Sequence, residues 1–136
     1  MITLYNVPVS SYGSKIRIIL DHKQLDWTEI PPPDGYGSGA YKAIIPAGTV
    51  PAIDHDGFRL ADSEAIAEYL DTVFSTPPMR PDAPQAAASA RELSRFHDTR
   101  IEPLVRSYFS QVTPATRDAA LIAANAALLQ TRPDDL

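Results

Sequence analysis

Residues 7–17, VPVSSYGSKIR, gather hydroxyl groups where a short apolar run gives way to an amphipathic one. Ser10, Ser11 and Ser14 lie within this segment, together with Tyr12. A serine at the start of a helix can accept a hydrogen bond from a backbone N–H, and such an N-cap contributes about 1 kcal/mol. The same hydroxyl can instead face a substrate and donate a hydrogen bond to it. The segment leaves both roles open, although by itself it favours the cap.

These hydroxyl groups need a strand and a helix to hold them in place. Residues 2–5, ITLY, predict a short buried strand, and the apolar residues at helical spacing in 16–20 predict a helix that ends near Lys23. Residues 27–30, WTEI, predict a second strand, which three prolines close. A strand–helix–strand unit of this kind implies parallel pairing with a right-handed crossover.

The next segments predict the rest of a sheet. Residues 40–45 predict one or two helical turns. Residues 50–60 predict a β-hairpin, because an Asp-Gly pair separates two apolar runs. Residues 63–70 predict an amphipathic helix with Asp62 or Ser63 as its cap. The predicted fold class is therefore α/β, with a four-stranded sheet in the element order βαβ-α-ββα.

A Pro-rich stretch at residues 74–81 marks a change in composition and predicts a linker. Beyond it the pattern is helical, with an apolar stripe over residues 84–109 that Pro103 interrupts, so we expect a kink there. An Ala-rich helix is predicted to begin at Thr113 or Pro114 and to run to about Gln130. The predicted organisation is an α/β domain over 1–75, a linker over 76–83 and an all-α segment over 84–136.

Composition excludes several classes of function. The chain has 136 residues, a net charge of -5 and no cysteine, so disulfides, thiolate metal sites and a cysteine nucleophile are excluded. The 12 basic residues are scattered, which argues against nucleic acid as a partner. The three histidines share no ligand spacing, so no metal site is predicted. No apolar run approaches the ~18 residues of a membrane span and no secretory signal is visible, so we expect a cytoplasmic protein.

Four motifs, in their order along the chain, resemble the glutathione transferase superfamily, whose members join a thioredoxin-like N-terminal domain to an all-helical C-terminal domain. Residues 10–20, SSYGSKIRIIL, are similar to the first-helix motif of the serine-type zeta and tau classes. Residues 46–51, PAGTVP, are similar to N-P-x-G-x-V-P, and residues 62–70, DSEAIAEYL, to [EQD]-S-x-A-I-x-x-Y-L. The fourth match is the Pro-rich linker with a long helix after it. The resemblance implies a shortened helical domain.

The resemblance implies that the protein stabilises the thiolate of glutathione for attack on a small electrophile, in a conjugation or an isomerisation. A free thiol has a pKa of about 8.5, so only a few per cent is ionised at neutral pH. Ser10 matches the catalytic position of the serine-type classes, and its hydroxyl would donate a hydrogen bond to the sulfur. Ser11 is the neighbour that could replace it or donate a backbone N–H. Tyr5 offers a rival hydroxyl.

The resemblance also implies how the rest of glutathione is held. A cis peptide bond before Pro51 would present the N–H and C=O of Val50 to the cysteinyl part of the tripeptide. Asp62 would pair with the γ-glutamyl ammonium. The Ser63 hydroxyl and the N–H groups at this helix start would bind the γ-glutamyl carboxylate, because helix N-termini favour anions.

Two further glutathione contacts follow from the same resemblance. Lys42 would reach the glycyl carboxylate, and Thr49 occupies the site position before V-P where relatives often carry a basic or polar residue. Ile45 replaces the asparagine of the N-P motif, and these departures predict a weaker affinity for glutathione. The implied co-substrate is glutathione without a metal, and the implied assembly is a homodimer. The alternatives are a non-catalytic transferase-fold module for binding or dimerisation, and an inactive fragment of a longer enzyme.

Overall fold

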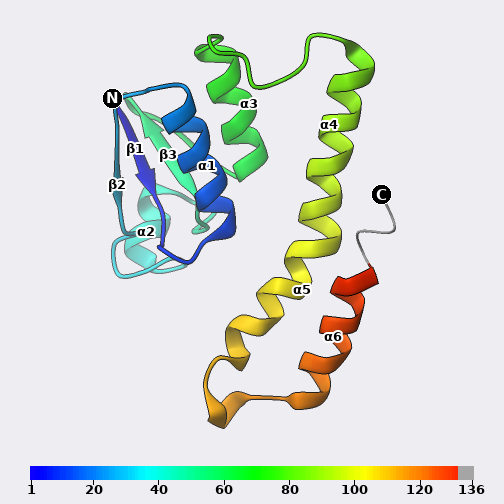
Figure 1. Ribbon diagram of the computed structural model, residues 1–136. Helices are drawn as coiled ribbons and strands as arrows, with labels where there is room; N and C mark the ends of the chain where they lie inside the picture. Colours follow the sequence, from blue (N-terminus) through cyan, green and yellow to red (C-terminus); the bar gives the residue numbers. More distant parts are fainter. Residues whose placement is uncertain (132–136) are drawn as a thin grey trace. The chain divides into compact units, whose positions relative to one another are not determined.

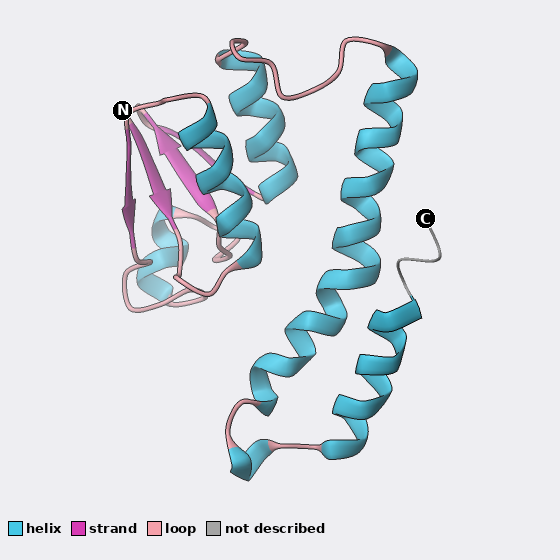
Figure 2. Ribbon diagram, viewed as in Figure 1, coloured by secondary structure: helices cyan, strands magenta, loops and turns pink. Residues whose placement is uncertain are grey.

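The chain folds into two units, which the computed structural model describes over residues 1–131 (Figure 1). The first unit runs from Met1 to Met79 and the second begins at Arg80, a division that falls inside the segment 76–83 for which the sequence predicts a linker. Among the described residues, strands occur only in the first unit, while the second consists of helices and their connections (Figure 2).

The first unit is a four-stranded mixed sheet with three helices, which confirms the predicted fold class. Its strand order is β2-β1-β3-β4; β1 pairs with β2 in parallel, whereas β3 is antiparallel to β1 and β4. Strand β3 begins two residues later than predicted, because Pro51 has no N–H to give to a strand ladder. The elements are β1 Ile2–Tyr5, α1 Ser11–His22, β2 Trp27–Ile30, α2 Gly39–Ile44, β3 Ala52–His55, β4 Phe58–Ala61 and α3 Ser63–Val73.

Side chains of β1 alternate between two cores, one on each face of the sheet. Leu4 points to the face that α1 and α3 cover, and these two helices contact each other (Figure 1). Tyr5 points to the opposite face and packs with Tyr41 of α2. The buried core under α1 and α3 comprises Ile2, Leu4, Ile16, Ile19, Leu20, Ile53, Ile66 and Leu70.

A buried lysine ties the end of α1 to the end of α3. Lys23 follows α1, and its side chain is 0% exposed. Its ammonium donates to the Asp71 carboxylate at 2.8 Å and to the carbonyls of Phe74 and Pro77 at 2.6 and 2.7 Å. A charge can be buried only where such partners replace water. Lys23 therefore fixes the segment that leads out of the first unit.

In the second unit, a widened helical turn accompanies the proline for which a kink is predicted. Helix α4 (Pro84–Phe96) leads into a π-helical turn, His97–Ile101, and then into α5 (Glu102–Ser107). Pro103 has no N–H to donate to the preceding turn, and its ring crowds the carbonyl four residues earlier. The N–H of Glu102 bonds to the carbonyl of His97 instead, five residues back. The wider turn thus accommodates the proline within a continuing helix.

The predicted start of the last helix is wrong. Residues Pro114–Thr116 form only a 3₁₀ turn, and α6 runs over Ala119–Thr131. Its start is set by the Asp118 carboxylate, which accepts the N–H groups of Ala120 and Leu121 at 2.9 and 3.1 Å. An aspartate in this position is a strong cap, and it outweighs the proline signal upstream. The helix continues to Thr131, the last described residue, so the predicted end near Gln130 stays a prediction and residues 132–136 lie outside the described residues.

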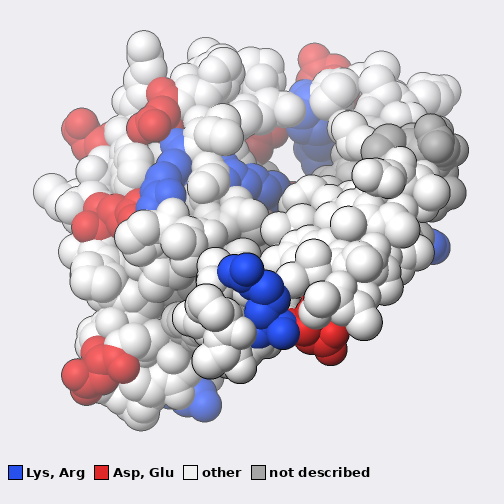
Figure 3. Space-filling view, turned by 60° about the horizontal axis from the view of Figure 1, so that its bottom comes forward, with Lys and Arg blue, Asp and Glu red and all other residues white. Residues whose placement is uncertain are grey.

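Charged side chains of both signs lie on the face shown in Figure 3. The Lys and Arg atoms are scattered there among Asp, Glu and a majority of uncharged residues, without an extended basic area. Over residues 1–131, no helix is both long and apolar enough to cross a bilayer.

Candidate functional site

Three segments that carry predicted site residues meet at one end of the sheet. Tyr5, at the end of β1, lies opposite Ala52 at the start of β3, and Ala52 lies opposite Ala61 at the end of β4. The connection from β1 to α1, the segment before β3 and the start of α3 therefore share this end (Figure 1). The N-termini of α1 and α3 are both part of it, and helix N-termini attract anions.

Ser10 is the N-cap of α1, as its position predicts. Its half-buried side chain accepts the N–H of Gly13 at 3.0 Å. A hydroxyl that accepts one hydrogen bond still has its own proton to donate. No described residue accepts that proton. Capping and donation to a ligand are therefore compatible in one side chain.

The neighbouring hydroxyl groups divide into structural and exposed ones. The Ser14 hydroxyl donates to the Ser10 carbonyl at 3.1 Å, so it supports the helix start. Ser11 is the first residue of α1 and is exposed. Tyr5 is 8% exposed, and its ring lies against Tyr41 in the core on the α2 face, with the ring centroids 5.6 Å apart.

The Asn6 side chain packs against Gly13 in the first turn of α1, a contact that the sequence does not predict. The residue is 2% exposed, and neither polar atom of its side chain has a hydrogen-bond partner of normal geometry among the described residues. It does lie close enough to Glu29 to help lower the pKa of that carboxyl, which is lowered mainly by a hydrogen bond from Arg17. An ideal Cβ on Gly13 would lie 2.0 Å from Oδ1 of Asn6. Only glycine fits at position 13 in this first turn.

A Gly13→Ala substitution is expected to destabilise the first unit by about 1–3 kcal/mol, because the added methyl overpacks the buried Asn6 amide. In a free helix the same change would stabilise by about 1 kcal/mol. Urea unfolding, followed by the fluorescence of the single tryptophan, Trp27, measures the effect. Gly39→Ala is the matched control, since nothing lies within 4 Å of its Cβ position. An equal response of the two variants would contradict the Asn6 contact, as would failure of an added Asn6→Ala to restore stability to Gly13→Ala.

The segment before β3 presents main chain rather than side chains. The Val50-Pro51 peptide bond is cis, as predicted, and Pro51 is buried. Val50 is half-buried, and no described residue forms a hydrogen bond with its N–H or C=O. The Thr49 side chain is exposed, while its carbonyl accepts a hydrogen bond from the Tyr41 hydroxyl at 3.0 Å.

Lys42 lies beside this segment. Gly48 has a φ of +66°, and an ideal Cβ there would lie 2.9 Å from Cε of Lys42. The lysine stem therefore runs along Gly48, and the side chain is exposed. This places an exposed positive charge near Thr49, which follows Gly48 in the chain.

At the start of α3, one residue caps the helix and the next residue keeps donors that could bind a ligand. Asp62, with a φ of 80°, caps the helix: its Oδ1 accepts the N–H groups of Glu64 and Ala65 at 2.9 and 3.1 Å. Those two N–H groups are therefore occupied by the cap. Ser63 is 7% exposed, and no described residue bonds its hydroxyl or its N–H. Ser63 thus keeps two donors at a helix N-terminus.

The comparisons with known proteins place this site in a family. The model for the glutathione S-transferase N-terminal domain matches residues 4–78, more than half of the chain. The chain belongs to the glutathione S-transferase family. It is 33% identical over 106 residues to the maleylacetoacetate isomerase of Rattus norvegicus, covering 74% of this chain and 49% of that protein. It is 39% identical over 82 residues to glutathione S-transferase Z1 of Arabidopsis thaliana, covering 57% and 37%. The chain thus spans about half the length, or less, of these relatives.

Solved structures agree with the glutathione S-transferase assignment. The theta class enzyme of Xanthomonas axonopodis pv. citri, determined with glutathione bound, has a TM-score of 0.81 at 27% identity and matches 94% of this chain and 64% of its own. Glutathione transferase F2 of Populus trichocarpa has a TM-score of 0.83 at 20% identity, with 98% and 67% covered, and shows the shared fold.

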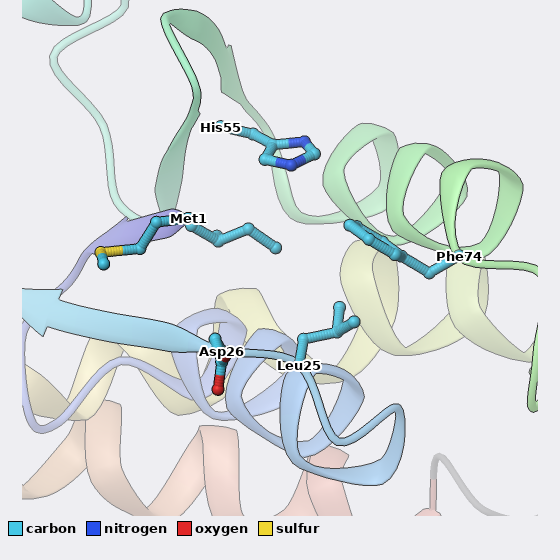
Figure 4. A pocket seen from close by; sticks show the side chains of 6 residues that line it. Met1, Leu25, Asp26, His55 and Phe74 are labelled. Carbon is cyan, nitrogen blue, oxygen red and sulfur yellow. The ribbon is translucent and has the colours of Figure 1, made fainter.

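A separate hollow lies at the other end of the sheet, where Ile2 faces His55. Figure 4 shows the side chains of Leu25, His55 and Phe74 around it. The His55 ring is held by the Tyr69 hydroxyl, 2.8 Å from Nδ1. Within residues 1–131, no group of three or more His, Asp or Glu side chains is arranged to hold a metal ion.

Proposed function

We propose that this chain provides the glutathione site of a glutathione-dependent enzyme, which holds the thiolate for attack on a small electrophile. The observation that carries the proposal is the set of unused hydrogen-bonding groups at one sheet end: the Ser10 hydroxyl, the Val50 main chain and the Ser63 donors. Two of them are at helix N-termini, which suits a ligand with anionic groups. Glutathione has a thiol, two carboxylates and an amine, so each unused group has a matching partner.

In this proposal Ser10 is the catalytic residue. Its free proton bonds to the sulfur while Gly13 keeps the oxygen in place, and the N-terminus of α1 adds a positive potential. A decrease of ~2 units in the thiol pKa corresponds to about 2.7 kcal/mol of preference for the thiolate. Ser11, which is exposed at the same helix start, is the alternative hydrogen-bond donor to the sulfur.

The remaining contacts follow the tripeptide. The Val50 N–H and C=O pair with the cysteinyl main chain beside Pro51. The Ser63 hydroxyl and N–H bind the γ-glutamyl carboxylate, and the free carboxylate oxygen of Asp62 faces the γ-glutamyl ammonium. Lys42 reaches the glycyl carboxylate past Thr49.

The reaction is either conjugation or a glutathione-dependent isomerisation. The names of several relatives, maleylacetoacetate isomerases of rat, mouse and Pseudomonas aeruginosa, support isomerisation of a small unsaturated acid. We further propose a cytoplasmic homodimer without a metal, as the family resemblance implies. A non-catalytic binding module is the second candidate, since the hydrogen bond from the Gly13 N–H explains the Ser10 side chain as a helix cap alone.

Calorimetry with glutathione tests the proposed site directly. Saturable binding is expected, and Ser63→Ala should weaken it about 10- to 100-fold, because a hydrogen bond to a charged group is lost. Ser75→Ala, a change at an exposed serine outside the site, is the control and should bind normally. Absence of binding at millimolar glutathione would refute the proposal. Binding without turnover of an aryl halide or of maleylacetoacetate would favour the non-catalytic module.

A further inference from the structure

Tyr41 is fully buried and carries a hydroxyl group that has no part in the proposed reaction. We propose that Tyr41 is a positioning residue, whose hydroxyl sets the orientation of the Val50 N–H before glutathione binds. This inference rests on the proposed function, because it assigns a role within the same site.

The argument begins with the loop that leads to Val50. The N–H of Gly48 bonds to the Ile45 carbonyl at 2.8 Å, and the Gly48 carbonyl accepts the N–H of Gly37 at 2.7 Å. The next carbonyl, that of Thr49, accepts the Tyr41 hydroxyl at 3.0 Å. Hydrogen bonds thus hold the N–H and C=O of Gly48 and the C=O of Thr49.

The Thr49 carbonyl and the Val50 N–H belong to one peptide group. That bond is trans, since the described cis bonds are Val50-Pro51 and Thr76-Pro77. In a planar trans peptide the C=O and N–H point in opposite directions, so fixing one fixes the other. By holding the Thr49 carbonyl, Tyr41 aims the Val50 N–H away from itself, where no described residue bonds it.

Tyr41 is itself held rigidly enough for this role. It is 0% exposed, its ring lies against Tyr5, and it sits in α2, whose N-cap Ser38 accepts the Tyr41 N–H at 3.0 Å. Burial raises the pKa of Tyr41 to about 12, so the hydroxyl keeps its proton to donate throughout the neutral range. Without the tyrosine hydroxyl, the Thr49 carbonyl would bond to water instead, and the peptide group that it shares with Val50 would lose its fixed orientation.

Tyr41→Phe removes one oxygen and tests the role. Glutathione should bind about three- to tenfold more weakly, as one neutral hydrogen bond that preorganises the site is lost. The pKa of the bound thiol, read from thiolate absorbance, should stay unchanged, because Ser10 and not Tyr41 contacts the sulfur. A general loss of structure would instead change both quantities, and thermal unfolding monitors it. Tyr69→Phe is the matched control, since its hydroxyl bonds to His55 at the other end of the sheet.

A measurement on the unchanged protein keeps the inference testable even where Tyr41→Phe folds poorly. In the free protein, the Val50 amide should show a nuclear magnetic resonance order parameter of about 0.85, like the strand residues Ala52 and Ile53. A mobile Val50 amide would overturn the inference, as would equal glutathione affinity in the wild type and Tyr41→Phe. Failure of the wild type to bind glutathione would instead remove the proposed function itself, so the two failures are distinguishable.

Discussion

Ser10→Ala is expected to lower the turnover of glutathione with an aryl halide about 100-fold, the usual cost of removing one donor to a reacting anion. The pKa of the bound thiol should rise by about 2 units, and titration of thiolate absorbance against pH measures this shift. Glutathione affinity should change far less, because Val50 and Ser63 still hold the tripeptide. The helix also loses its cap, which costs about 1 kcal/mol of stability.

Two further variants separate the cap from the catalytic hydroxyl. Ser10→Thr keeps both the acceptor for the Gly13 N–H and the free O–H, and should retain most activity. Ser10→Asp keeps a strong cap but places a negative charge beside the sulfur, so it should be stable and inactive. If Ser10→Ala turns over normally, Ser10 is only a cap, and Ser11 or Tyr5 becomes the donor to test.

Lys23→Met should lower the free energy of unfolding of the first unit by about 3–5 kcal/mol, the range for breaking a buried ion pair from one side. The substitution keeps the apolar stem but removes the ammonium that bonds to Asp71 and to the carbonyls of Phe74 and Pro77. Asp71 keeps the hydrogen bond from the Met79 N–H, whereas the ammonium's share of its charge compensation is lost. Urea denaturation monitored through Trp27, which lies in β2, measures the loss in this unit.

Arg59→Gln provides the control for a charge pair of the same unit. Arg59 donates to Asp54 at 2.9 Å, but its side chain is 49% exposed, so this variant should lose at most about 1 kcal/mol. Comparable losses for the two variants would show that Lys23 behaves as a surface charge, and the described role of Lys23 would then be wrong.

The sheet could be predicted because its signals are local. Residues 2–5 and 27–30 are short segments rich in β-branched and aromatic residues between turn formers, and Asp56 with Gly57 fixes the hairpin. The last helix was misplaced because Pro114 and Asp118 both signal a helix start and only the structure shows which one prevails. The π-helical turn before Pro103 was also out of reach, since a proline is compatible with either a bend or a widened turn.

The candidate site was predictable where a residue acts through its own position in the chain. Ser10 and Asp62 directly precede helices, so their capping roles follow from the sequence. The cis bond at Pro51 lies in the Val-Pro pair that ends the motif PAGTVP. Asn6 and Tyr41 were missed because they act through contacts with other segments. A tyrosine in an apolar stretch predicts only a core residue. Its bond to the Thr49 carbonyl depends on the path of the loop after α2, which brings Thr49 back to the Tyr41 hydroxyl.

The register of the hairpin has a consequence for how this chain tolerates changes in length. Its turn, at Asp56 and Gly57, lies at the far end of the sheet from the candidate site. Extra residues there would bulge into solvent and leave the pairing of Ala52 with Ala61 intact. A single residue inserted between Pro46 and Ala52 would displace Val50 from that alignment. Insertions and peptide tags therefore belong at the hairpin turn, while the connection before β3 must keep its length.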